Sequence, residues 1–134
     1  MAEFTNFLED ELLDHAFSEG VRLWAAPSTG LYLALLTVVG SDTLTGTTIT
    51  EPGTGAYARK AISFAAAASG LVDNTAAHTF TNTAATAWTV VGVGICSAAT
   101  VGDLYCFDND MTDATINQSE KLQFALGDID ITLD

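Results

Sequence analysis

The stretch that decides the fold runs from residue 55 to residue 97 and reads GAYARKAISFAAAASGLVDNTAAHTFTNTAATAWTVVGVGICS. It holds two strand-like runs, Tyr57–Phe64 and Trp88–Ser97. Between them nearly every residue is Ala, Thr, Ser, Asn or Gly, and no phosphate-binding loop, metal-ligand pair or partnered nucleophile occurs. The stretch therefore predicts a segment that builds a sheet and presents a smooth surface without catalytic chemistry.

The composition of the whole chain limits the class of protein. At 134 residues it has the size of one domain and can bury a core without a disulfide or a metal. Charged residues make up only 16% of the chain, whereas about a quarter is usual in a soluble domain. A surface poor in charge and rich in Thr, Ala and Ser suits packing against other proteins.

The net charge of −13 is concentrated at the two ends of the chain. Six acidic residues lie within 1–20 and eight within 101–134, whereas the charges between them cancel. Nucleic acids and anionic membranes both require clustered Lys and Arg, so we expect neither as a partner. A basic protein partner or a solvated outer face fits this charge distribution better.

The N-terminus is acidic, which is not typical of a signal peptide, and the apolar run Leu31–Val39 is too short to span a membrane. We therefore expect synthesis in a cytoplasm, where thiols stay reduced. The two cysteines, Cys96 and Cys106, cannot be paired from sequence, and the favoured interpretation is two buried thiols.

Residues 1–20 are predicted to form an acidic amphipathic helix or arm, with the helix over 5–19. Asn6 and Glu9 have the spacing of a capping box, and Gly20 is a natural stop. The expected apolar face comprises Leu8, Leu12, Leu13, Ala16 and Phe17. So short a helix needs a docking surface, which is either the sheet of its own chain or a neighbouring molecule.

Residues 21–134 are predicted to form one β-sandwich domain. Residues 40–56 between the first two strands predict a long loop that carries contacts or mobility. Because there is no β–α–β alternation and no evident internal repeat, we expect a mainly β fold, an antiparallel β-sandwich or jelly-roll-like barrel with one N-terminal α-helix. The predicted strands are Leu31–Val39, Tyr57–Phe64, Thr79–Thr83, Trp88–Ser97, Leu104–Phe107, Leu122–Leu126 and Ile129–Leu133.

We predict no catalytic residue, no cofactor and no metal site. His15 lies in the acidic helix without a nucleophile, and His78 is interpreted as a loop histidine. The carboxylates of Asp108, Asp110 and Asp113 alternate as in a calcium loop, but the central Gly and the terminal Glu of that motif are missing. A solvated acidic turn is the favoured interpretation.

Two adjacent bases, Arg59 and Lys60, lie in a predicted strand of a strongly acidic chain. We expect them to pair with carboxylates, within the subunit or across an interface, since arginine holds a carboxylate through two parallel hydrogen bonds. The candidate residues for a partner interface are Phe4, Phe7, Leu8, Leu12, Tyr57, Arg59 and Lys60.

Five segments, in order along nearly the whole chain, carry a family resemblance. They are NFLEDELLDHAF (6–17), LYLALLTV (31–38), GTGAYARKAISF (53–64), NTAAHTFTNTAATAWTVVGVGI (74–95) and LQFALGDIDITLD (122–134). With them the chain resembles a family of small virion proteins of tailed bacteriophages, often labelled tail fibre or hypothetical. The resemblance implies a particle component without enzymatic activity, made in the cytoplasm of a bacterial host.

Within such a particle, a compact sandwich without repeats or a shaft favours a capsid decoration or cement protein. We expect it to bind the outer surface of the major capsid protein shell, or other virion proteins, and to bridge capsomers as a homo-oligomer, a dimer or trimer. The alternative is a tail, neck or head fibre adhesion module, contacting the host surface through the 40–56 loop and Trp24 or Tyr57. A small hydrolase is the least favoured class.

Overall fold

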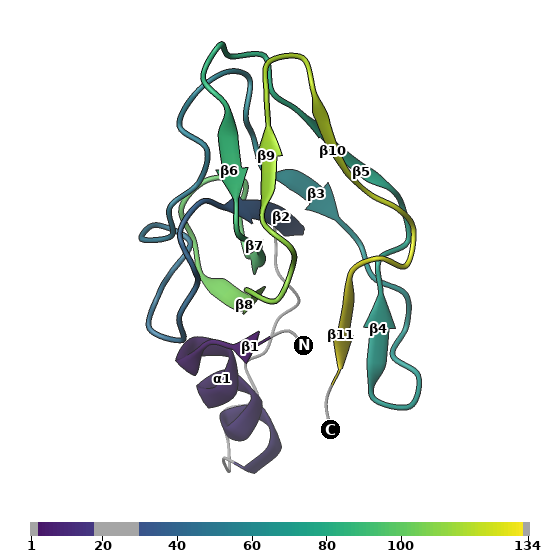
Figure 1. Ribbon diagram of the computed structural model, residues 1–134. Coiled ribbons are helices and arrows are strands. Elements are labelled where there is room, and N and C mark those ends of the chain that lie inside the picture. The colour runs from purple at the N-terminus through teal and green to yellow at the C-terminus, as the bar shows by residue number, and fades with distance from the viewer. Residues whose placement is uncertain (1–2, 18–29, 133–134) are drawn as a thin grey trace.

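The computed structural model describes residues 3–17 and 30–132 (Figure 1). It is mainly β and antiparallel, with one helix near the N-terminus, which confirms the predicted fold class. The elements are β1 (Glu3–Phe4), α1 (Asn6–Phe17), β2 (Leu31–Leu36), β3 (Lys60–Ile62), β4 (Leu71–Asp73), β5 (His78–Thr81), β6 (Trp88–Val90), β7 (Gly92–Cys96), β8 (Leu104–Asp108), β9 (Ala114–Ile116), β10 (Lys121–Phe124) and β11 (Asp130–Thr132).

A five-stranded antiparallel sheet, ordered β1-β8-β7-β2-β3, forms the first layer. Its strand β2 is buried on both faces, because Leu33 and Leu35 enter one core while Ala34 and Leu36 enter another. Burial on both faces explains why β2 is a continuous apolar run rather than an alternation of apolar and polar residues.

The second layer is a two-stranded ribbon that runs through three consecutive pairings. Strand β6 pairs with β9, β5 with β10 and β4 with β11, all antiparallel. Residues 71–90 and 114–132 thus form one long hairpin-like ribbon with two interruptions. Figure 1 shows it as an arch, with β6 and β9 on one side and β4 and β11 on the other.

A fully buried asparagine, Asn82, bridges the first interruption of the ribbon, which lies between the β6–β9 and β5–β10 pairings. Its amide nitrogen donates to the carbonyls of Thr86 at 2.9 Å and Ile116 at 2.8 Å. Its amide oxygen accepts the backbone N–H of Ala84 at 2.9 Å. One side chain therefore replaces the ladder hydrogen bonds that the bend removes.

A second buried asparagine, Asn74, does the same at the other interruption, between β5–β10 and β4–β11. Its amide nitrogen donates to the carbonyls of Ala76 and Ala125, at 2.6 and 2.9 Å. Its amide oxygen accepts the N–H of Ile129 at 2.9 Å. Both bends of the arch therefore depend on the same device.

The two bends share a sequence as well as a geometry. The tetrapeptide Asn-Thr-Ala-Ala occurs at 74–77 and again at 82–85, on either side of β5. The expectation of no internal repeat was therefore wrong at this short scale. Small residues after each asparagine leave room for the chain to turn beneath its side chain.

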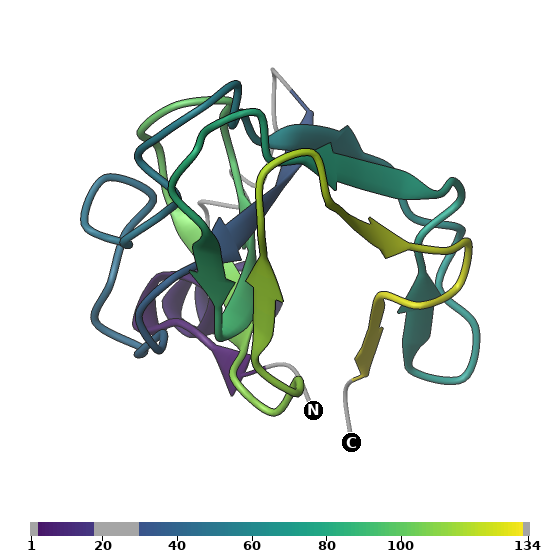
Figure 2. The ribbon, with the colours of Figure 1, turned by 45° about the horizontal axis from the view of Figure 1, so that its top comes forward.

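Two cores result from this arrangement of a sheet beneath an arch, and Figure 2 shows the strands of both. The inner core lies between the sheet and the ribbon and contains Leu33, Leu35, Ile62, Phe80, Trp88, Val90, Ile95, Cys106, Ile116 and Ile129. The outer core lies on the other face of the sheet and contains Ala34, Leu36, Ile49, Cys96, Leu104 and Phe107. The packing is sandwich-like, with the layers unequal in width.

The loop 40–56 covers the outer core rather than standing free. Ile49 is buried in that core, and Leu44 packs against it. The backbone N–H of Thr37 donates to the Thr50 carbonyl at 2.9 Å and joins the loop to the end of β2. The loop was expected to carry contacts or to be mobile, and these interactions favour the first of the two roles.

The predicted strand Trp88–Ser97 is two strands, because the chain passes from the ribbon to the sheet at Val91. The N–H of Val91 donates to the Leu36 carbonyl at 2.9 Å, which anchors the crossing point. Three short strands were not predicted: β1, β4 and β9. They have two or three residues each, too few for an alternation to show.

The helix is capped one residue earlier than the sequence suggested. Thr5 is fully buried, and its hydroxyl oxygen lies 3.5 Å from the backbone nitrogen of Leu8. Thr5 therefore replaces Asn6 as the capping residue. The expected single apolar face is wrong in part, because Leu13 and Phe17 are 57% and 81% exposed.

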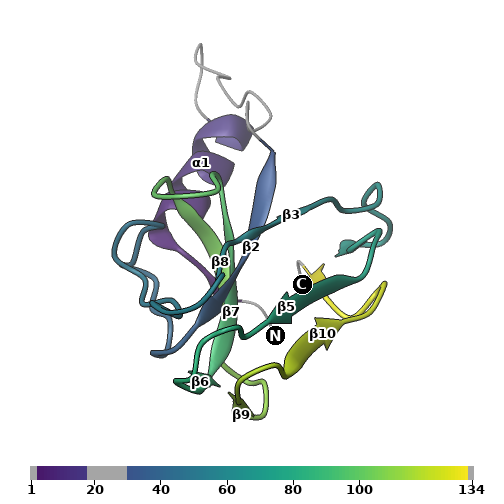
Figure 3. The same ribbon diagram turned by 90° about the horizontal axis from the view of Figure 1, so that it is seen from above.

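Figure 3 shows α1 beside β8, on the side of the sheet away from β5 and β10. Leu8 is buried there and Leu12 is half-buried. The division into an arm (1–20) and a β-sandwich (21–134) stays a prediction, since residues 18–29 lie outside the described part of the chain.

The bend at Asn82 yields the first testable prediction. Replacing Asn82 with Ala removes its three hydrogen bonds to backbone groups, so we expect the free energy of unfolding to fall by about 3 kcal/mol. Urea denaturation of the purified protein measures this. Asn117→Ala, at an exposed side chain that bonds Glu120, is the matched control and should cost less than about 0.5 kcal/mol. A loss below about 1 kcal/mol at Asn82 would contradict the role assigned to it.

Candidate functional site

The residues predicted for an interface fall into two groups in space. Phe4, Phe7, Leu8 and Leu12 belong to β1 and α1, which pack on β8. Tyr57 and Arg59 lie together just before β3, and Lys60 begins that strand. That these residues contact a partner stays a prediction.

Arg59 is the most heavily bonded side chain described, and its side chain is only 3% exposed. It forms a salt bridge with Glu51, with Nη2 2.8 Å and Nε 3.0 Å from the two carboxylate oxygens. Its Nη1 donates to the carbonyls of Ala98 and Val101, at 2.9 and 2.8 Å. Its Nη2 also donates to the carbonyl of Gly46. The guanidinium therefore joins the 40–56 loop to the turn after β7.

The packing at this junction is close enough to require a glycine. A Cβ added at Gly46 would lie 2.5 Å from the carbonyl oxygen of Val101. No side chain fits at that distance, so the loop reaches Arg59 only because residue 46 is glycine.

Tyr57 completes the cluster around Glu51. Its hydroxyl donates to Glu51 Oε1 at 2.6 Å and accepts the backbone N–H of Leu35 at 3.0 Å. Its ring stacks on Phe80 and meets Trp88 edge-on, with centroids 6.0 and 5.7 Å away. Burial, together with the hydrogen bond to Glu51 and its charge, raises the pKa of Tyr57 well above its usual range. The ring is half-buried and packs against these two aromatic side chains.

The arm is attached to β8 by one aromatic pair and by Thr5, whose hydroxyl donates to the Leu104 carbonyl and whose backbone N–H donates to the Tyr105 carbonyl at 3.0 Å. Phe7 and Tyr105 lie parallel, with ring centroids 5.7 Å apart and an interplanar angle of 4°. Phe7 keeps 39% of its surface exposed, and Phe17 near the end of α1 keeps 81%. The arm therefore covers its own sheet with Leu8 while it presents aromatic surface to the outside.

The remaining residues with reactive side chains include two cysteines, and both lie in the cores. Cys96 and Cys106 are free and buried in the outer and inner core, respectively. Burial raises the pKa of Cys96 to about 11 and of Cys106 to about 12, so both stay protonated thiols at neutral pH. Within the described residues no group of three His, Cys, Asp or Glu side chains is arranged to hold a metal ion.

The acidic turn after β8 is closed by a side-chain hydrogen bond. The carboxylate of Asp108 accepts the backbone N–H of Asp110 at 2.7 Å. This local turn supports the interpretation of the run as an acidic turn.

His78 is not the loop histidine that the sequence suggested. It begins β5, is only 9% exposed, and its Nε2 has no hydrogen-bond partner among the described residues. Burial, and secondarily the charge of Lys60, lowers its pKa. Lys60 itself lies over the ring of Phe80, with Nζ 5.9 Å from the centroid.

The fold and these clusters define a small, mainly β protein whose buried polar groups hold loops and bends together. Over residues 3–132 the chain matches the family described as podophage GP4 fiber I protein gp80. Because the match spans nearly the whole chain, the protein belongs to this family and is a structural virion component of a tailed phage. The resemblance to small tailed-phage virion proteins is confirmed.

No curated protein matches the chain. No helix among the described residues combines the length and apolarity needed to cross a membrane.

The Arg59 cluster can be tested with a conservative change. Arg59→Lys keeps the charge but cannot satisfy Glu51 and three carbonyls together, so we expect a loss of about 2–4 kcal/mol in the free energy of unfolding. The reverse change at an exposed site, Lys121→Arg, is the control and should shift it by less than about 0.5 kcal/mol. Urea unfolding of both variants gives the comparison, and equal stabilities would rule out Arg59 as the main tie of the loop.

The buried histidine predicts a pH dependence of stability. The pKa of His78 is lowered in the folded state, so the unfolded chain binds the extra proton first, and stability falls as the pH drops below the unfolded value of about 6.5. His78→Gln should reduce this slope between pH 7.5 and 5.5, measured by thermal unfolding. Parallel profiles for wild type and His78→Gln would refute the prediction.

Proposed function

We propose that the protein is a non-enzymatic structural subunit of a fibre, attached to other proteins of the phage particle. The single observation that favours a fibre is the family description, which names a fibre protein. The described clusters support a structural role, since Arg59 and the two buried asparagines use their hydrogen-bonding groups to hold the chain's own loops and bends.

The surface supports attachment through protein contacts. Apolar side chains remain open on α1, at Leu13 and Phe17, and on the chain after β2, at Val38 and Val39. Each is more than half exposed. Phenylalanine is among the residues enriched at protein interfaces, so Phe17 is the best candidate of the four for a contact.

A capsid decoration or cement protein is the second candidate. It would bind the outer surface of the major capsid protein shell and bridge capsomers. The compact two-layer fold favours it, since the described residues contain no extended shaft. Both candidates place the protein on the particle surface, and either is compatible with a dimer or trimer.

Direct contact with the host remains a further role for a fibre subunit. The aromatic residue proposed for sugar binding, Tyr57, has its ring packed against Phe80 and Trp88. Trp24 lies outside the described residues. We therefore propose attachment within the particle, rather than sugar binding at the 40–56 loop, as the primary role.

Counting copies per particle tests the placement. A fibre attaches where the particle has low rotational symmetry, so the number of copies is small. Quantitative mass spectrometry of purified particles should therefore count on the order of a dozen copies. Hundreds of copies would contradict the fibre placement and favour a capsid decoration protein. Absence of the protein from purified particles would refute both placements.

A further inference from the structure

A furrow remains open between the sheet and the last part of the ribbon. It consists of two adjoining hollows of about 360 and 120 Å³. The two share Ile95, Cys106 and Ile131 in their walls. Half-buried apolar side chains from three parts of the molecule, Phe4 of the arm, Phe64 after β3 and Val72 of β4 among them, face the larger hollow.

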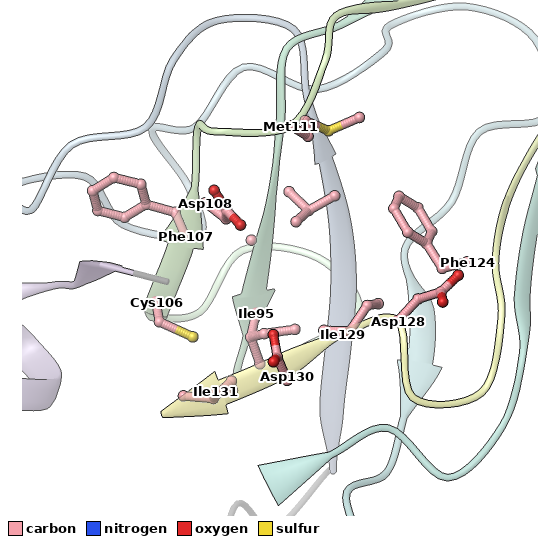
Figure 4. Close-up of a pocket in the computed structure, with 12 residues that line it drawn as sticks. Ile95, Cys106, Phe107, Asp108, Met111, Phe124, Asp128, Ile129, Asp130 and Ile131 are labelled. Atoms are coloured by element: carbon pink, nitrogen blue, oxygen red, sulfur yellow. The ribbon is translucent and has the colours of Figure 1, made fainter. Parts of the chain in front are cut away.

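The smaller hollow carries the charge of the furrow. Figure 4 shows the carboxylates of Asp108, Asp128 and Asp130 among the apolar side chains of the pocket. No described Lys or Arg lines either hollow. The furrow therefore combines an apolar floor with an acidic end, which suits an occupant that is both apolar and basic.

Strand β11 borders the furrow. Its neighbour on one side is β4, and no described strand pairs with its other side. Exposed strand edges accept an added strand through backbone hydrogen bonds. The apolar hollow beside this edge makes a strand the best-fitting form of occupant.

An unfavourable pair of like charges lies across the β4–β11 ladder. Asp130 of β11 is directly opposite Asp73 of β4, and paired residues of an antiparallel ladder project from the same face. Like charges in this position destabilise a ladder, so a basic side chain beside them would be attracted by both. The next pair along, Ile131 and Val72, faces the apolar hollow.

We propose that an extended segment of another virion protein, with alternating aliphatic and basic residues, adds as a strand to the free edge of β11. Its aliphatic side chains enter the furrow beside Ile131, and a Lys or Arg lies beside Asp130 and Asp73. A second copy of this chain fits poorly, because its net charge is −13 and its own β11 would bring a further Asp130. The proposal rests on the proposed function only in taking the partner from the particle.

Charge reversal at Asp130 separates stability from binding. Asp130→Lys removes the like-charge pair with Asp73, so the melting temperature of the purified protein should rise by about 1–4 °C. The same change repels a basic segment, so the copies found in purified particles should fall at least fivefold. Asp42→Lys, an equal charge change on the loop over the other face of the sheet, is the matched control and should stay within twofold of wild type.

The copies are counted in particles grown from a phage that lacks this gene and is complemented with each variant. Normal incorporation of Asp130→Lys overturns strand addition, whereas absence of the wild-type protein overturns the proposed function instead. A photo-crosslinking benzophenone residue in place of Val72 gives an independent result. The crosslinked peptide should come from another virion protein and carry Lys or Arg beside aliphatic residues. A crosslink to a second copy, to a peptide without bases, or to nothing overturns the proposal.

Discussion

Covering a five-stranded sheet with a two-stranded ribbon is the constraint on which this structure depends. Neighbouring strands lie about 4.8 Å apart, so a straight ribbon covers less than half the width of such a sheet. The ribbon instead bends at Asn82 and Asn74 and passes over the sheet as an arch. The inner core exists because each bend keeps its backbone groups bonded through one buried amide.

The same constraint explains the open furrow. The arch encloses the aromatic centre of the core, where Phe80 and Trp88 are almost fully buried. In the last segment of the arch, no described strand pairs with the second edge of β11, and Ile131 is only half-buried. The outer face of the sheet is closed differently, by the 40–56 loop, which Arg59 joins through Glu51 and Gly46 to the carbonyls of Ala98 and Val101. The described residues thus close the outer face, whereas the inner face keeps the furrow for which we propose a partner.

Residue patterns predicted the parts of the fold that repeat over enough residues. The apolar run beginning at Leu31 predicted β2, and the alternation of Ile129 and Ile131 predicted β11, although each observed strand is shorter. Strands β4 and β9 have three residues each and no usable period. The positions of these strands depend on the two buried asparagines. In the sequence, the repeated Asn-Thr-Ala-Ala is the one sign of these asparagines.

The candidate site was predictable to a similar degree. An arginine in an acidic chain was expected to hold a carboxylate, and Arg59 does so. Its partner Glu51 lies in a loop without periodicity, so its role depends on a tertiary contact that local patterns do not encode. Leu13 and Phe17 were expected to dock with Leu8, but the helix contacts the sheet through a narrow stripe that leaves both exposed.

We propose that another virion protein pairs with the edge of β11 that no described strand occupies. A reconstruction of the particle by electron cryomicroscopy, at a resolution that shows side chains, would reveal this pairing. We expect an extended segment of a different protein alongside β11, with a basic side chain next to Asp130. A β11 edge that faces solvent in the assembled particle, or that pairs with a second copy of this chain, would contradict it.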